Sequence, residues 1–184
     1  SGGVRARVVR DELSQHPVLV YAGIEAALAA ASTRLLYAET ISNPTIVLAD
    51  LARLAKLGHG HGATVVVDNT FATALVQRPL ELGATLSLTS TTKYINGHCN
   101  ALGGVVCTDE PRWHQKMVFS QKALGLQPSP FDCWLITRGI KTLPLRMRQQ
   151  MANAAALADQ LADHPSVNWV RYPHRADHPQ YNVA

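Results

Sequence analysis

The stretch from Ser87 to His98, SLTSTTKYINGH, concentrates side chains that could do chemistry. Four hydroxyl residues in succession, Thr89 to Thr92, stand directly before Lys93, and a glycine and a histidine follow. Short hydroxyl side chains can hydrogen-bond phosphate oxygens, and a lysine amine in a partly desolvated pocket is a nucleophile. The stretch therefore indicates either an exposed polar turn or a loop that binds a phosphate and presents an amine.

A second polar group follows three valines, where Asp68 and Asn69 end the segment VVVDN. A carboxylate at such a position is costly unless a cation or a proton donor pairs with it. A cationic ring nitrogen for Asp68, a phosphate for the hydroxyls and an aldehyde for Lys93 together describe pyridoxal phosphate (PLP). These residues alone leave open a plainer interpretation, in which a polar strand exit carries a solvated Lys93.

The elements that must position these side chains alternate along the chain. A β-branched, apolar composition predicts a strand buried on both faces over 63–68, and an apolar run predicts another buried strand over 34–39. Further strands are expected over 84–90 and 103–108, and helices over 24–31, 46–62 and 78–83. Strands alternating with helices indicate an α/β fold with a mainly parallel sheet and flanking helices.

Such a fold also predicts where a ligand binds. In an open parallel sheet, ligands bind beyond the carboxyl ends of the strands. Three candidate loops follow expected strands: 39–44 (ETISNP), 68–69 and the hydroxyl-rich stretch itself. We therefore expect the three loops to converge on one crevice.

The later part of the chain changes character. Long helical patterns cover 112–124 and 132–161, and the second should break near Gly139 and Pro144. The segment 166–173, SVNWVRYP, is typical of a strand that begins a new unit. We therefore predict a large domain over 1–145, and a long helix with the start of a second domain over 146–184. Both ends look abrupt, which suggests a fragment of a larger protein.

Composition limits the class of protein. The chain has 184 residues, of which 47% are hydrophobic and 16% charged, as in a single globular domain with a buried core. The formal net charge of +4 is scattered among acids, so no nucleic-acid face is expected. The segment from Arg138 to Arg148 carries four basic residues and is interpreted as a solvated or subunit-facing surface, with an anion site as the alternative.

Location and metal content follow from a few further features. The sequence contains no apolar run of membrane-spanning length and no signal core, so we expect no membrane association. Three cysteines without a C-x-x-C pair argue against a disulfide framework or zinc site and favour the reducing cytoplasm. His59 and His61, two residues apart, do not share a helix face, and we predict no metal site.

Several motifs occur together and in order. They are ETISNPT, VVVDNTFAT, QRPLELGA, STTKYINGH, LGGVV, SPFDCWLITRGIKTLPLRM and HPSVNWVRYP. Together they closely resemble the Cys/Met-metabolism family of PLP enzymes, which includes cystathionine γ-synthase, cystathionine γ-lyase, methionine γ-lyase and the O-acylhomoserine sulfhydrylases. The resemblance covers nearly the whole chain and implies the large domain of a PLP-dependent transferase of the aspartate aminotransferase type.

The resemblance also implies roles for individual residues. Lys93 would bond covalently to the cofactor and later move protons, and Asp68 would keep the pyridine nitrogen protonated. Asn43 would reach the phenolic oxygen. The phosphate would be held by the hydroxyls of Ser90 and Thr92 and by the backbone of Gly2 and Gly3.

The implied reaction is β- or γ-elimination, or γ-replacement, on sulfur-containing or O-acylated amino acids. The implied partners are a small amino-acid substrate and further copies of the chain, which at full length would form a tetramer built from dimers. Gly3, where methionine γ-lyases tend to have cysteine, weakly favours the cystathionine enzymes.

Some positions depart from the family pattern and support an alternative. Ser1 stands where the family has a tyrosine that stacks on the cofactor, and Cys99 and Asn100 replace a usual Ser-Asp. The alternative is a catalytically inactive, truncated remnant that binds PLP weakly or acts only as an oligomerisation partner. A nucleotide-binding α/β protein is disfavoured, because neither G-x-G-x-x-G nor G-x-x-x-x-G-K-[ST] is present.

Overall fold

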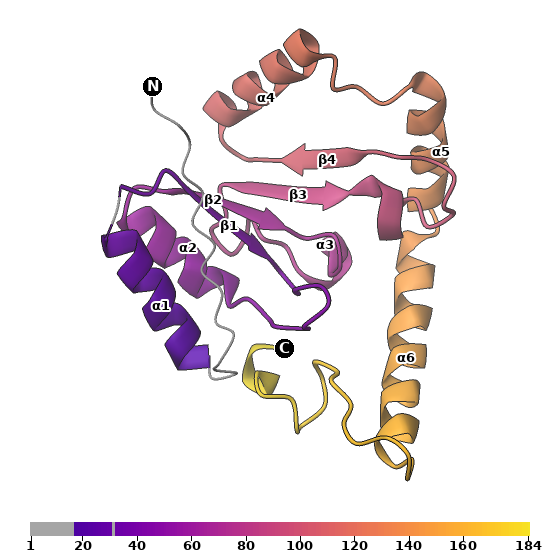
Figure 1. Cartoon of the computed structure of the whole chain (residues 1–184). Helices are drawn as coiled ribbons and strands as arrows, with labels where there is room; N and C mark the ends of the chain where they lie inside the picture. The colour runs from indigo at the N-terminus through magenta and orange to yellow at the C-terminus, as the bar shows by residue number, and fades with distance from the viewer. Residues whose placement is uncertain (1–16, 31) are drawn as a thin grey trace.

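The computed structural model describes residues 17–30 and 32–184, and the side chains from residue 23 onward within that range. A small sheet forms its centre, and helices follow the strands in sequence (Figure 1). In chain order the elements are α1 (Pro17–Ala29), β1 (Leu35–Glu39), α2 (Leu51–Gly60), β2 (Thr64–Asp68), α3 (Thr73–Val76), β3 (Leu86–Ser90), the π-helical turn η1 (Thr91–Ile95), β4 (Gly104–Cys107), α4 (Pro111–Leu124), α5 (Pro130–Ile140), α6 (Leu143–Ala162) and the 3-10 turn η2 (Tyr181–Val183).

The sheet confirms the predicted α/β architecture. Its strands lie in the order β1-β2-β3-β4; the first three are parallel, and β4 runs antiparallel to β3. The register places Glu39 beside Asp68, and Asp68 beside Leu88. The ends of the three parallel strands therefore lie in one row across the sheet.

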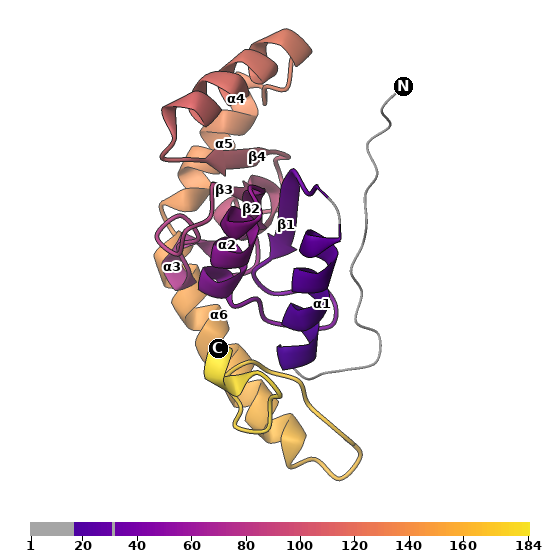
Figure 2. The same cartoon turned by 90° about the vertical axis from the view of Figure 1, so that its left-hand side faces the viewer.

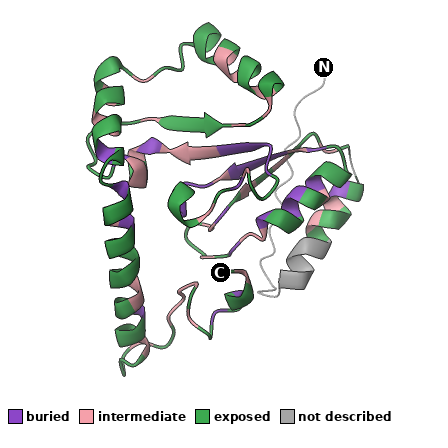
Figure 3. Ribbon diagram, turned by 180° about the vertical axis from the view of Figure 1, so that it is seen from behind, coloured by how far each residue is buried: buried purple, intermediate pink, exposed green. Residues whose placement is uncertain are grey.

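The core lies under β2. Val65 and Val67 are each 1% exposed and pack with Leu51 and Ala84. Figure 3 shows the buried colour in the middle of the sheet. Val66, on the opposite face, is also buried, which confirms the prediction of a strand buried on both faces.

The strand predicted over 34–39 is present as β1, but the prediction that it is buried was wrong. Leu35 is 56% exposed and Tyr37 51% exposed. These side chains are exposed because β1 is the edge strand of this sheet and pairs only with β2 among the described strands. An edge strand lacks the second neighbour that covers a central strand such as β2.

Helix α2 begins later than the helix predicted over 46–62. The preceding segment turns back on itself through a bridge between Ile41 and Leu48, and the Asp50 side chain then accepts a hydrogen bond from the backbone N–H of Arg53. An aspartate in this position satisfies one of the free N–H groups of the first turn. The buried face of α2, with helical spacing, is formed by Leu51, Leu54, Ala55 and Gly58.

Two other predicted elements were wrong. Residues 78–83 form successive turns instead of a helix, with the N–H of Leu82 bonded to the C=O of Pro79, and Gly83 takes a φ of +92°. The bonds of this segment join residues three apart, as in successive turns, and the positive φ of Gly83 ends it before a helical ladder can form. The segment 166–173 is not a strand in the structure, and no described strand pairs with it. A strand without a neighbour has no ladder to stabilise it.

The helical region after β4 divides as expected. A break at residues 141–142 separates α5 from α6, between Gly139 and Pro144. Figure 2 shows α4, α5 and α6 following one another along the length of the molecule. Within the described residues, no helix is long and apolar enough to cross a bilayer. The division into domains at residues 145 and 146 stays a prediction.

The contact between α2 and the sheet depends on Gly58. A Cβ at this position would stand 2.5 Å from Cγ2 of Val65 and 3.2 Å from Cδ2 of Leu36. We expect Gly58→Ala to lower the free energy of unfolding by about 1–3 kcal/mol, since it overpacks a filled contact. Urea denaturation measures the change. Gly60→Ala is the matched control in the same helix, because its Cβ would meet no described atom within 4 Å outside its chain neighbours and the backbone of the helix itself. An equal loss in both variants would contradict the packing argument.

Candidate active site

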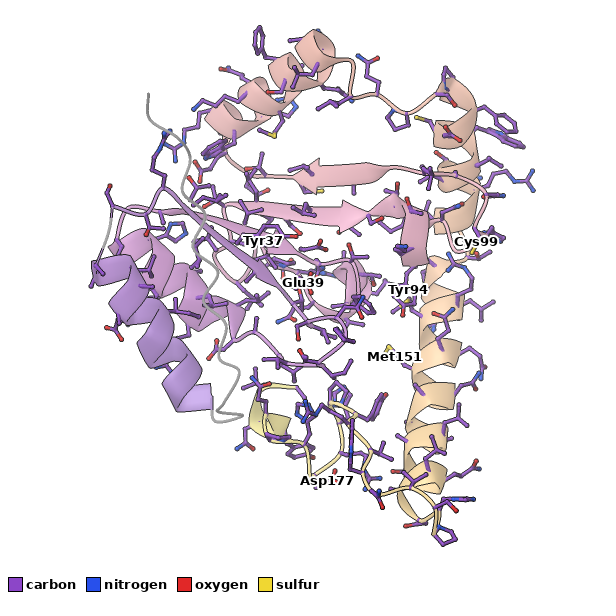
Figure 4. The ribbon with its side chains drawn as sticks, in the orientation of Figure 1. Tyr37, Glu39, Tyr94, Cys99, Met151 and Asp177 are labelled. Carbon is purple, nitrogen blue, oxygen red and sulfur yellow. The ribbon has the colours of Figure 1, made fainter. Side chains whose placement is uncertain are left out.

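The loops that follow the three parallel strands meet at one cleft. It has a volume of about 810 Å³, within the range of small-molecule sites. Asn43 reaches it from the loop after β1, Phe71 from the loop after β2, and Lys93 from the turn after β3. In Figure 4, Tyr94 and Met151 lie between the sheet and α6, and Cys99 lies by the junction of α5 and α6. The expected convergence of the three loops is therefore observed.

The lysine turn, η1 with the two residues after it, is a tight and irregular segment. Lys93 has φ −90° and ψ −120°, which interrupts the helical geometry of η1. The N–H groups of Asn96 and Gly97 close the turn on the carbonyls of Thr91 and Lys93, at 3.0 and 2.8 Å. Lys93 is exposed, and its Nζ has no hydrogen-bond or ion-pair partner within the described part of the chain. The backbone is held while the amine stays available at the cleft.

Asp68 is fixed by two donors. The N–H of Thr70 donates to its Oδ1 at 2.9 Å, and the hydroxyl of Tyr37 donates to its Oδ2 at 3.0 Å. Although half of the Tyr37 side chain is exposed, partial desolvation of its hydroxyl, followed by the negative charge of Asp68, raises the pKa of Tyr37 to about 12. Tyr37 therefore stays protonated and remains a donor, which orients the carboxylate that the sequence assigned to a ring nitrogen. Asp68 does not itself line the cleft.

The two hydroxyls assigned to a phosphate differ in their surroundings. Ser90 Oγ has no hydrogen-bond partner among the described residues, whereas its N–H donates to Oγ1 of Thr70 at 2.9 Å. Thr92 Oγ1 accepts from the N–H of Gly103 at 3.0 Å and donates to the carbonyl of Gly103 at 3.3 Å. Ser90 is thus free to bind an anion, and Thr92 could do so by turning its hydrogen away from the longer of its two bonds.

Asn43 lies on a loop that the end of the chain holds in place. The N–H of Asn43 donates to Oε2 of Glu39 at 3.1 Å. Further along this loop, the side-chain amide of Gln180 accepts from the N–H of Leu48 at 2.8 Å and donates to its C=O at 2.7 Å. The imidazole of His178 contacts the same loop, with its Nε2 at 3.2 Å from the carbonyl of Ile46. Two side chains from the last residues therefore hold the loop that carries Asn43.

Sequence reasoning missed three of the residues that hold the site. In the sequence, Tyr37 belongs to an apolar strand pattern, Thr70 follows the Asp-Asn pair, and Gln180 belongs to a polar segment. No sequence signal marks Tyr37 or Gln180, since each acts on a partner that is distant or on another strand. The bond from Thr70 to Asp68 is a local turn that an aspartate favours, but the second bond of Thr70, to Ser90 after the next strand, has no local signal. Gly2 and Gly3, which were assigned to the phosphate, lie outside the described residues.

Comparison with known proteins identifies the family. Residues 12–184 match the sequence profile described as Cys/Met metabolism PLP-dependent enzyme. The chain belongs to this family. A probable cystathionine γ-synthase of Herpetosiphon aurantiacus is 47% identical over 153 residues, which cover 83% of this chain and 48% of that protein. A cystathionine γ-lyase of Dictyostelium discoideum is 45% identical over 151 residues, which cover 82% of this chain and 39% of the relative.

Solved structures of family members share the fold. Cystathionine γ-synthase from Xanthomonas oryzae pv. oryzae has a TM-score of 0.84 at 43% identity, covering 86% of this chain and 41% of that chain. The chain therefore has the fold of the PLP-dependent cystathionine enzymes, as predicted, and it spans less than half the length of these relatives.

The polar groups at and beside the cleft fit the cofactor of this family. Lys93 lines the cleft, whereas Asp68 and Ser90 lie two residues before the lining residues Thr70 and Thr92. PLP needs an amine for its aldehyde, an acid for its ring nitrogen and donors for its phosphate. Lys93 and Ser90 have polar atoms without protein partners among the described residues, and Asp68 keeps a fixed carboxylate at the end of the adjacent strand. These are the groups that such a ligand would use.

The contact between Gln180 and Leu48 can be tested by hydrogen exchange. Gln180→Ala leaves the buried N–H and C=O of Leu48 without their partner, and we expect the Leu48 amide to exchange about tenfold faster or more. Amide hydrogen exchange measures this. Gln149→Ala is the control, since its side chain bonds to Asn153 on the exposed face of α6. Unchanged exchange at Leu48 would contradict the holding role of Gln180.

The Tyr37–Asp68 bond predicts a dependence of stability on alkaline pH. Because the folded-state pKa of Tyr37 is raised from 10.0 to about 12, its contribution is fully present below pH 10 and is lost as the pH rises toward 12. Tyr37→Phe has no ionisable hydroxyl, so this variant should not show this part of the alkaline loss of stability. Urea midpoints measured across this pH range test it, with Tyr181→Phe as the control. An identical alkaline loss in wild type and Tyr37→Phe would contradict the prediction.

Proposed function

We propose that the protein catalyses PLP-dependent β- or γ-elimination, or γ-replacement, on sulfur-containing or O-acylated amino acids. The observation that carries this proposal is the amine of Lys93, which stands without a protein partner among the described residues at a cleft formed by the ends of parallel strands. Relatives with 45–47% identity are named cystathionine γ-synthase and cystathionine γ-lyase.

Each residue of the site would have a defined task. Lys93 would hold the cofactor through its amine, and Asp68, oriented by Tyr37, would face the ring nitrogen as a carboxylate. Ser90 and Thr92 would bind the phosphate, and Asn43 would bind the phenolic oxygen. The backbone of Gly2 and Gly3 would add phosphate donors. When bound, the cofactor supplies an electron sink for the bond that breaks at the α-carbon of the substrate.

Lys93 would also move the proton. Once a substrate amine has displaced it, its free amine would take the α-proton as a general base and later return a proton. The structure from Xanthomonas oryzae contains aminoacrylate and cysteine, and a cystathionine γ-lyase from Lactobacillus plantarum contains L-serine. These ligands of relatives support an amino acid as the substrate class.

The alternative of an inactive remnant is not favoured. The relatives are enzymes, and the residues assigned to the cofactor are present in this chain. A homo-oligomer and a cytoplasmic location remain part of the proposal. Exposed apolar side chains on α4 and α5, including Phe119, Phe131 and Trp134, support subunit contacts. Three free, exposed cysteines are compatible with a reducing compartment.

Substitution of Lys93 tests the proposal. The wild-type chain with PLP should show a visible absorption band, and reduction with borohydride should attach the cofactor to the peptide that contains Lys93. Lys93→Ala should lose both, and α-proton exchange should fall by about 10²–10⁴-fold. Absorption spectra and peptide mass measure these outcomes.

Lys122→Ala, on the exposed surface of α4, is the matched control and should behave as wild type. A folded wild-type chain, shown by circular dichroism, that gives no band and no attached cofactor would contradict the proposed function.

A further inference from the structure

The side chain of Arg146, near the start of α6, is directed at the lysine turn. Its Nη1 donates to the carbonyl of Tyr94 at 2.8 Å, and its Nη2 donates to the carbonyl of Ile95 at 3.2 Å. Nη2 also donates to the carbonyl of Gly139 at 2.9 Å, and Nε to Oγ1 of Thr142 at 3.0 Å. One guanidinium therefore joins the turn to the end of α5 and the start of α6.

The carbonyls that Arg146 binds are those that the turn cannot satisfy alone. A helical segment leaves its last carbonyls without partners. In this turn the N–H groups of its last two residues bond to the carbonyls of Thr91 and Lys93, and Arg146 takes the carbonyls of Tyr94 and Ile95. Its positive charge also suits the carbonyl end of a helical turn.

The chemistry of this contact requires an arginine. A guanidinium presents five N–H donors in a planar fork, whereas a lysine ammonium is a compact point charge. Four of the five donors of Arg146 are used by Tyr94, Ile95, Gly139 and Thr142. Too few remain for a bidentate bond to a substrate carboxylate, although Arg146 borders the cleft.

Two glycines show how closely these segments pack. A Cβ on Gly97 would collide with the guanidinium of Arg146, and a Cβ on Gly139 would collide with the backbone of Asn96. The lysine turn, α5 and the start of α6 therefore fit together without room for a side chain at either point. Arg138, Lys141 and Arg148 of this basic segment are exposed, as expected for a solvated surface, whereas Arg146 is half-buried and bonded within the chain.

We propose that Arg146 is a positioning residue that fixes the backbone of the lysine turn, so that the amine of Lys93 stands ready at the cleft before any cofactor binds. The role of that amine rests on the proposed function. The contact with the turn does not, because it is made within the protein chain alone.

The test compares Arg146→Lys and Arg146→Gln with Arg148→Lys and Arg148→Gln, since Arg148 is exposed on the same helix. The first measurement is amide exchange of Asn96 and Gly97 in the chain without PLP. It should be about tenfold faster or more in both Arg146 variants and unchanged in the Arg148 variants. Exchange in β2 reports whether each variant is folded.

The second measurement is the rate at which Lys93 captures PLP, trapped by borohydride reduction at a temperature where every variant is folded. Capture should slow by about tenfold or more in the Arg146 variants, because a small displacement of a reacting group is costly. A merely stabilising residue would leave this rate unchanged. The proposal would be overturned if the amides of Asn96 and Gly97 exchanged at the wild-type rate in Arg146→Lys. It would also be overturned if they exchanged faster in the Arg146 variants while the rate of PLP capture stayed unchanged.

Failure of the proposed function gives a different result. If the folded wild-type chain captured no PLP, the proposed function would be contradicted, but the proposed role of Arg146 in holding the turn would not. The exchange rates of Asn96 and Gly97 would then decide whether Arg146 holds the turn.

Discussion

The parallel pairing of β1, β2 and β3 is the constraint on which the site depends. Because Glu39, Asp68 and Leu88 share one row of the sheet, the segments that follow them must leave from the same edge. Side chains from three separate loops can then meet at one cleft. A shift of one residue in this register would turn the side chains of a strand to the opposite face.

A buried polar network secures this edge. Thr40 Oγ1 donates to Oδ1 of Asn69 at 2.8 Å, and the N–H of Asn69 donates to the carbonyl of Leu88 at 2.8 Å. Thr70 then joins Asp68 to the N–H of Ser90. The motif Asp-Asn-Thr therefore divides its tasks: the carboxylate of Asp68 is held by Tyr37 and Thr70, while Asn69 and Thr70 tie the strand ends together.

The lysine turn depends on helices that lie outside the sheet. It is held by α5 and by the start of α6, about fifty residues later in the chain, through the close approach at Gly139 and the guanidinium of Arg146. The loop of Asn43 is held in a comparable way by Gln180. In both cases a later segment of the described chain supports an earlier loop.

The sequence alone determined the family and the mainly parallel sheet, and it supplied the prediction of the site residues. The valines of β2 and the order of the motifs carried this information, because both are local patterns. Only the tertiary structure decided the exposure of β1, the turns at 78–83 and the absence of a strand at 166–173. It also showed which side chains hold the loops and strand ends of the site: Tyr37, Thr70, Arg146 and Gln180. Each of these outcomes depends on which neighbour a segment meets in space, and a local pattern does not specify that neighbour.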